Sequence, residues 1–187
     1  TAIINQLNIN ASSLEGYLLP GDYFFYDDVE PEEILLKMNS SLFNFFTDSL
    51  LQRMEELGFS LHEIITLASI IEGETNLKKE MPTVSGVYHN RLKIGMPLQA
   101  DPTIQYVLEG GWRRLLYRDL EIDSPYNTYK HRGLPPGPIN NPGKEAILAA
   151  LYPEEHNFYY FVADGKGGHK FTRNYQEHLR AVREYRE

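Results

Sequence analysis

The sequence contains no cysteine and comparatively little positive charge. Without thiols, disulfide bonds and thiol chemistry are excluded, and the protein is compatible with an oxidising compartment. The 18 Lys and Arg residues are outnumbered by 26 Asp and Glu residues, which gives a formal net charge of −8. Basic residues are scattered except for a short run at positions 180–186. Since nucleic-acid binding needs a clustered positive surface, a nucleic-acid partner is not expected.

Long hydrophobic runs are also missing. No stretch approaches the roughly 20 apolar residues of a membrane-spanning helix, and no signal peptide is visible. The chain starts at Thr1 instead of a methionine, so we expect it to be a fragment of a longer protein. Its 187 residues, of which 42% are hydrophobic, suit a single domain with a sizeable core. The 13 tyrosines combine an apolar ring with a polar tip, which suits a carbohydrate or peptide groove as well as ordinary packing.

The periodicity of apolar residues predicts a mostly helical chain. Helices are expected over residues 31–57, 61–75, 82–95 and 174–187, with short helices from residue 101 and over residues 143–153. Ser60 and Glu63 form a capping-box pattern at the start of the second helix. Asp101 is expected to be the N-cap of the helix that follows it, with Pro102 at the first position.

Two further segments complete the predicted fold. Residues 110–143 are rich in Gly, Pro, Asn and Tyr and are expected to form a long surface excursion. Two β-prone runs flank a glycine-rich turn at Asp164–Gly168, which indicates a hairpin. The expected fold class is therefore α+β, mostly helical, with one small antiparallel sheet.

Two acids end an otherwise apolar helix in the sequence LASIIEGETN, at Glu72 and Glu74. Two residues apart, they point to nearly opposite sides of the helix and cannot share a proton. Each has apolar neighbours on its own face, so burial should raise its pKa and allow it to act as a general acid. The alternative is a solvated glutamate in the last helical turn. Periodicity does not choose between the two, although Thr75 favours Glu74, because a hydroxyl after the acid helps to fix the local backbone.

Several familiar sites are not indicated. The six histidines show no zinc-binding spacing, and no metal or cofactor is expected. The sequence DGKGGH lacks the spacing of a phosphate-binding loop, and no nucleophile elbow is present. His169 and Asn174 remain candidates to line a groove.

Four motifs occur in order along the chain: LASIIEGET, VYHNRLKIGMPLQADPTIQY, YNTYKHRGLPPGPINNPG and YYFVADGKGGHKF. Together they resemble the catalytic domain of the MltG (YceG-like) family of endolytic murein transglycosylases. The resemblance implies a lysozyme-like catalytic domain over residues 14–187, with residues 1–13 as the tail of a preceding LysM-like region or linker. It also implies cleavage of the β-1,4 bond between N-acetylmuramic acid and N-acetylglucosamine in peptidoglycan, which leaves 1,6-anhydro ends.

The resemblance also implies a location and partners. Family members act on the outer face of the bacterial inner membrane and are anchored by an N-terminal helix, which this chain lacks. Cell-wall synthases of the penicillin-binding class are the expected protein partners.

Roles for individual residues follow from the matching motifs. Glu74, followed by Thr75, corresponds to the catalytic acid, and Tyr129 to a tyrosine implicated in activity. Glu72 matches a frequent acid of the motif, for which the resemblance implies a structural role. The candidate substrate-binding residues are Glu72, Thr75, Gln99, Asp101, Tyr126, Asn127 and Asn174. The alternative for Asn127 is that it simply makes its turn.

Two other functions stay open. A hydrolytic muramidase would use water, with Asp101 or Glu72 assisting Glu74. A non-catalytic glycan-binding module of the cell-wall synthesis machinery would bind strands without turnover.

Overall fold

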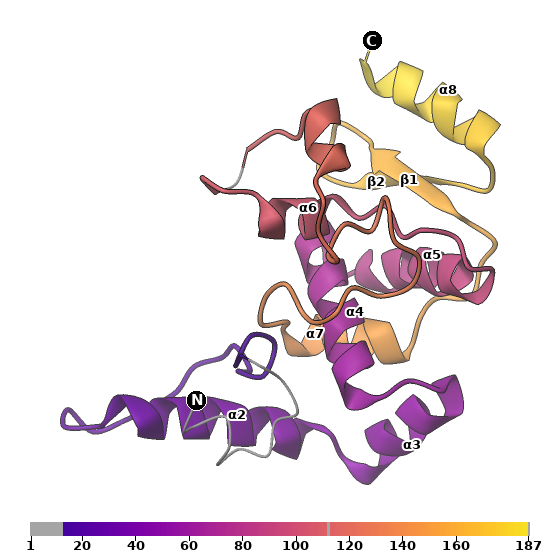
Figure 1. Cartoon of the computed structure of the whole chain (residues 1–187). Helices are drawn as coiled ribbons and strands as arrows, with labels where there is room; N and C mark the ends of the chain where they lie inside the picture. Colours follow the sequence, from indigo (N-terminus) through magenta and orange to yellow (C-terminus); the bar gives the residue numbers. More distant parts are fainter. Residues whose placement is uncertain (1–12, 112, 187) are drawn as a thin grey trace.

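The computed structural model describes residues 13–111 and 113–186 and confirms an α+β fold with a small antiparallel sheet (Figure 1). Along the chain the elements are α2 (Pro31–Phe45), α3 (Asp48–Leu57), α4 (Leu61–Glu74), α5 (Met81–Lys93), α6 (Asp101–Val107), the 3₁₀ helix η1 (Tyr117–Glu121), α7 (Lys144–Leu151), β1 (Tyr160–Ala163), β2 (His169–Thr172) and α8 (Tyr175–Arg186). No helix among the described residues is both long and apolar enough to cross a membrane. The predicted boundary at residue 13 remains a prediction, because residues 1–12 lie outside the described part.

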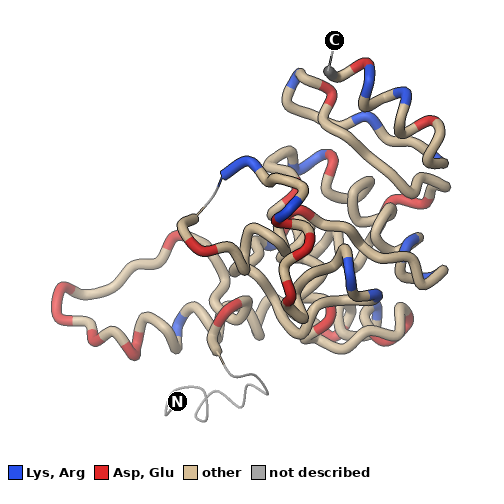
Figure 2. The backbone as a smooth tube through the Cα atoms, turned by 45° about the horizontal axis from the view of Figure 1, so that its top comes forward, with Lys and Arg blue, Asp and Glu red and all other residues tan. Residues whose placement is uncertain are grey.

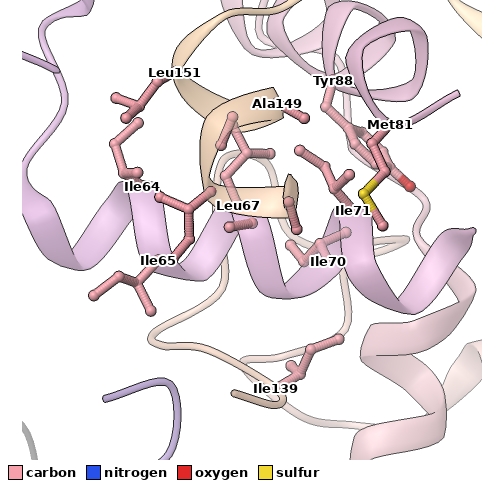
Figure 3. Close-up of a cluster of buried hydrophobic side chains, with 14 of the residues drawn as sticks. Ile64, Ile65, Leu67, Ile70, Ile71, Met81, Tyr88, Ile139, Ala149 and Leu151 are labelled. Carbon is pink, nitrogen blue, oxygen red and sulfur yellow. The ribbon is translucent and has the colours of Figure 1, made fainter. Parts of the chain in front are cut away.

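Helix α4 is the centre of the core. The predicted capping box is present: the Ser60 hydroxyl accepts a hydrogen bond from the Glu63 backbone N–H, and the Glu63 carboxylate accepts one from the Ser60 backbone N–H. Every residue from Ile64 to Ile71 is buried, against α7 and also against α5 and α6. In Figure 3 the side chain of Ile64 points toward Leu151 of α7. Burying an Ile or Leu side chain stabilises the fold by about 1.5–3 kcal/mol, so α4 is held rigidly.

The single helix predicted over residues 31–57 is wrong, because two helices occupy this range. Helix α2 ends at Phe45, and the backbone of Phe46 leaves the helical region as its ring turns into the core. Thr47 then takes the extended conformation that precedes the start of α3. The predicted helix end at residue 57 is confirmed, and Gly58 follows with a left-handed φ of 74° that glycine adopts without strain.

The predicted N-cap role of Asp101 is also wrong. Ala100 is the N-cap residue of α6, and Asp101 is the first residue inside the helix. The Asp101 carboxylate instead accepts a hydrogen bond from the hydroxyl of Tyr129. The Asp101 carboxylate therefore binds a residue that is distant in sequence and does not cap the helix.

The segment over residues 110–143 is less exposed than predicted. It contains η1, and its second half packs on α4, where Ile139 is buried. The Ile139 backbone N–H donates to the Ser69 hydroxyl at 3.0 Å, and the Asn140 amide donates to the Ser69 carbonyl at 2.8 Å. These hydrogen bonds attach the second half of the segment to α4, although its glycines and prolines are typical of a surface loop.

The hairpin is confirmed, with Tyr160 opposite Thr172 and Ala163 opposite His169. In its turn the Asp164 carboxylate accepts hydrogen bonds from the backbone N–H groups of Lys166 and Gly168. Helix α8 packs on both strands. The hairpin and α8 lie at the opposite end of the molecule from α2 (Figure 1).

Charge is distributed unevenly between these two ends (Figure 2). The segment from Pro20 to Glu33 carries six acidic residues and no basic one. In the hairpin and α8, by contrast, basic residues are interspersed with acidic residues. The net negative charge is therefore concentrated away from the hairpin.

Candidate active site

A cleft of about 410 Å³ opens between the core helices and the hairpin. One side, here called the body wall, consists of Glu74, Arg91, Leu98, Gln99, Asp101 and Tyr129. The other side, the hairpin wall, consists of strand β1, His169, Tyr175 and His178. The body wall collects residues from four separate segments, so the fold brings together positions that are distant in sequence.

Glu74 is the last residue of α4, and its carboxyl lies within the cleft. The hydroxyl of Tyr88, which is buried on α5, donates a hydrogen bond to Glu74 Oε1. Burial raises the pKa of the Glu74 carboxyl to about 8, assisted by the negative charge of Asp101. The Tyr88 hydrogen bond and the charge of Arg91 oppose this rise in the pKa without cancelling it. Glu74 is therefore largely protonated at pH 7 and can donate a proton.

Glu72 has a different environment, although it is only two residues away. Its carboxylate accepts a hydrogen bond from the backbone N–H of Gly143 at 3.2 Å. Gly143 is the N-cap residue of α7, so the negative charge lies at the positive end of that helix. The structure places Glu72 outside the cleft, in a position that holds α7 against α4. This choice between the two acids could not be made from the periodicity of the helix.

Tyr129 and Asp101 form a second tyrosine–carboxylate pair in the cleft. The Tyr129 hydroxyl donates to Asp101 Oδ1 at 2.5 Å. Burial, together with the charge of Asp101, raises the pKa of Tyr129 far above its usual range, so the phenol stays neutral. The pair presents a neutral hydroxyl beside a carboxylate on the same wall as Glu74.

Gln99 lies in the cleft with a left-handed backbone, at a φ of 51°. This conformation is uncommon for a residue with a side chain. The Gln99 backbone N–H donates to the Thr128 carbonyl at 3.0 Å, and its side-chain oxygen lies 3.3 Å from Nη1 of Arg91. Arg91 also donates to the Leu98 carbonyl at 2.7 Å and to the Tyr159 carbonyl at 2.7 Å. The buried guanidinium thus fixes the Gln99 loop and joins it to the chain that leads into β1.

Asn127 and Tyr126, both predicted to bind substrate, lie outside the cleft. Asn127 is fully buried, and its amide donates to the carbonyls of Leu120 and Ile122 at 2.9 and 2.8 Å. Its side-chain oxygen accepts from the backbone N–H of Tyr129 at 2.9 Å. Asn127 therefore positions Tyr129 and does not face the cleft. The ring of Tyr126 packs on a neighbouring tyrosine, 4.9 Å away between centroids.

Thr75 and Asn174 are likewise occupied by local hydrogen bonds. The Thr75 hydroxyl is buried and accepts from the backbone N–H of Leu77 at 3.1 Å, which fixes the turn after Glu74. Asn174 precedes α8 and accepts from the backbone N–H of Glu177 at 2.9 Å. Neither side chain is part of the cleft lining, so the cleft unites Glu74, Gln99, Asp101 and Tyr129 with the predicted groove-lining residue His169.

His169 lies in the hairpin wall and is oriented by Glu80. Its Nδ1 is 3.0 Å from Glu80 Oε2, and its backbone N–H donates to Glu80 Oε1 at 3.1 Å. Among the described residues, no group of three or more His, Asp or Glu side chains has an arrangement that could hold a metal ion. The histidine is thus part of a two-residue contact and not of a ligand set.

Sequence reasoning missed Tyr88, Arg91 and the rings of the hairpin wall other than His169. Tyr88 and Arg91 are three residues apart on α5, so they share one helix face, and both are buried. A tyrosine and an arginine on the inner face of a predicted helix were the available signal. The rings of the hairpin wall gave no such signal, because a strand and a helix bring them together only in the folded protein.

Comparisons with known proteins show the family of the chain. The model of the YceG-like family matches residues 2–184. A protein named endolytic murein transglycosylase from Bacillus subtilis (strain 168) is 42% identical over 172 residues, which cover 92% of this chain and 48% of that protein. One of the same name from Streptococcus pneumoniae (strain D39) is 34% identical over 183 residues, covering 92% of this chain and 32% of the relative. The chain thus spans about half the length, or less, of these curated relatives.

A solved structure is similar over almost the whole fold. The crystal structure of a yceG-like protein from Listeria monocytogenes superposes with a TM-score of 0.84 at 37% sequence identity. The match covers 96% of this chain and 62% of that chain. The helices and the hairpin that form the cleft therefore recur in a related protein.

Proposed function

The chain belongs to the YceG-like family, and from this premise we propose that it is the catalytic part of an endolytic murein transglycosylase. Its substrate is the glycan strand of peptidoglycan, cut between N-acetylmuramic acid and N-acetylglucosamine. The observation that supports this proposal most directly is the single carboxyl of Glu74, which burial keeps protonated at neutral pH inside a cleft.

In the first step Glu74 acts as a general acid. Its proton passes to the glycosidic oxygen while the bond between that oxygen and C1 of muramic acid breaks. Because the pKa of the carboxyl is about 8, most molecules carry the needed proton at pH 7. Tyr88 holds the carboxyl in one orientation and stabilises the carboxylate that forms.

In the second step the same group acts as a base. The Glu74 carboxylate takes the proton of the muramic acid 6-hydroxyl while that oxygen bonds to C1. The 1,6-anhydro ring closes, the carboxyl is restored, and no water is consumed. One carboxyl can therefore serve both steps, whereas most hydrolytic glycosidases use two.

The remaining residues of the body wall bind and stabilise the sugar. The carboxylate of Asp101 favours the positive charge that develops near C1, because it lies in the same cleft. Tyr129, anchored on Asp101, and Gln99, fixed by Arg91, provide polar groups for sugar hydroxyl or acetamido groups.

Asp101 also supports a second candidate function, a hydrolytic muramidase. Its position in the cleft with Glu74 would allow it to activate a water molecule. Glu72 is less suited to this role, since its carboxylate is bound to the start of α7.

Digestion of purified, uncross-linked glycan strands tests the proposal and separates the two reactions. We expect anhydro products, which are lighter by one water than the reducing ends of a hydrolase. The Glu74→Gln variant should lose activity by about 10³-fold, while the matched control Glu72→Gln should retain it. Retained cleavage by folded Glu74→Gln protein would refute the assignment, and strand binding without cleavage by the wild type would instead support a non-catalytic module.

The family also supports a proposal for location and partners. In this proposal the domain acts on the cell wall outside the cytoplasm, at the outer face of the inner membrane. An N-terminal anchor and partnership with cell-wall synthases are parts of this proposal that concern the longer protein.

A further inference from the structure

Three aromatic side chains of the hairpin wall lie next to one another in the cleft lining. Tyr160 on β1 and His178 on α8 are stacked, with centroids 5.3 Å apart and an interplanar angle of 26°. Tyr175, at the start of α8, lies 6.0 Å from Tyr160 and 6.4 Å from His178. All three line the cleft, and we refer to them as the ring platform.

Packing alone does not account for Tyr175. Its side chain is 58% exposed, although a tyrosine in a hydrophobic core would be covered. Its hydroxyl makes no hydrogen bond to another described residue, unlike the hydroxyls of Tyr88 and Tyr129, which are bound to carboxylates. The exposed ring therefore remains available to something that enters the cleft.

The platform is mainly neutral. Burial, and then the charge of Arg91, lower the pKa of His178, so the imidazole is uncharged at pH 7. Its Nδ1 is buried without a hydrogen-bond partner among the described residues. The neutral imidazole stacks on Tyr160 and packs beside the tilted ring of Tyr175, so this side of the cleft is not a site for an anion.

Arg91 connects the platform to the body wall. Its guanidinium lies 5.1 Å from the centroid of Tyr160, and its Nη1 contacts the side chain of Gln99. Arg91 thus links Gln99 of the body wall to Tyr160 of the ring platform.

We propose that the ring platform is a saccharide-binding subsite, which stacks on an N-acetylhexosamine unit beyond the two sugars of the cleaved bond. A pyranose ring has a face of C–H groups that packs on an aromatic ring. Tyr175 provides the exposed ring for this contact, and Tyr160 and His178 pack beside it and hold it in place. The proposal rests on the proposed function for the identity of the substrate, but it concerns binding and not the chemical step.

Binding of a soluble oligosaccharide to the full chain carrying Glu74→Gln tests the platform without cleavage. The probe is a hexamer of β-1,4-linked N-acetylglucosamine, titrated by calorimetry or NMR. Tyr175→Ala and His178→Ala, each added to this background, should weaken binding by about fivefold to tenfold. Tyr175→Phe should keep the affinity, because stacking needs the ring and not the hydroxyl.

Tyr185→Ala is the matched control, since Tyr185 is on the same helix, is 51% exposed and is not part of the cleft lining. It should leave the affinity unchanged. An affinity for the Tyr175→Ala variant within about twofold of the parent protein would overturn the subsite. Because Tyr175 is exposed, this variant should remain folded, and an unchanged melting temperature would verify that.

The outcomes also separate this proposal from the proposed function. If the wild type fails to cleave strands while Tyr175→Ala weakens oligosaccharide binding, the transglycosylase activity is contradicted and the subsite is supported. If the wild type cleaves strands and Tyr175→Ala binds normally, the activity is supported and the subsite is contradicted.

Discussion

The two walls of the cleft are constructed differently. In the body wall, Glu74 and Asp101 are each hydrogen-bonded to a tyrosine that burial keeps neutral, and Arg91 ties loops together. In the hairpin wall, rings stack on a two-stranded sheet and on α8, which packs mainly on that sheet. Proton transfer needs fixed geometry, whereas stacking tolerates small shifts. We therefore expect changes in the body wall to affect stability and chemistry, and changes in the hairpin wall to affect binding.

Arg91→Lys should have the largest effect on stability, because Arg91 joins the two walls. A lysine cannot replace a guanidinium that donates to three carbonyl groups, and buried acceptors would lose their partners. We expect a loss of about 3 kcal/mol in the free energy of unfolding, measured by urea denaturation. A loss below about 0.5 kcal/mol, as at an ordinary surface site, would show that the walls are held together independently of Arg91.

Glu74→Gln should stabilise the protein, and more so at higher pH. The ordinary carboxyl pKa is 4.5, and in the folded protein it is about 8. Between these values the unfolded chain releases a proton that the folded chain keeps, so wild-type stability falls as pH rises through this range. The variant, which cannot ionise, should gain on the order of 4 kcal/mol at pH 8 and almost nothing near pH 4. Thermal unfolding at both pH values measures this difference, and an equal effect at each would contradict the raised pKa.

Tyr129→Phe should lower turnover about tenfold while it changes the melting temperature little. The substitution removes the hydroxyl bound to Asp101 but keeps the ring packed. Steady-state cleavage and thermal unfolding measure the two effects. A large drop in melting temperature with proportionate loss of activity would mean that Tyr129 serves packing and not the reaction.

Asp101→Asn should shift the pH dependence of cleavage. The negative charge of Asp101 helps to raise the pKa of Glu74, so its removal lowers that pKa. Activity requires the protonated acid, and its decline at high pH should therefore begin at a lower pH in the variant, by up to about one unit. An unchanged alkaline limb would indicate that the two carboxyls do not interact.

Local features of the fold could be predicted from the sequence, whereas features that depend on tertiary contacts could not. The capping box of Ser60 and Glu63 and the turn at Asp164–Gly168 are local, and both were predicted correctly. The helix break at Phe46 and the position of Asp101 inside α6 were not predicted. The Phe46 ring is buried in the core, and the Tyr129 hydroxyl donates a hydrogen bond to the Asp101 carboxylate. In each case a tertiary contact overrode the local pattern.

The candidate site shows the same division. Glu74 and Tyr129 could be named from their motifs, but their partners Tyr88 and Asp101 are 14 and 28 residues away in sequence. Asn127 was predicted to contact sugar because an exposed-looking loop amide suits that role. Its burial depends on the path of residues 120–122, which no local pattern indicates.

The central claim is that the fold keeps the Glu74 carboxyl protonated at neutral pH. NMR titration of protein labelled with ¹³C at the glutamate side-chain carboxyls measures this directly, and the resonance absent from the Glu74→Gln variant identifies the group. We predict a midpoint near pH 8, in agreement with the pKa of about 8. A midpoint near the ordinary value of 4.5 would contradict the account.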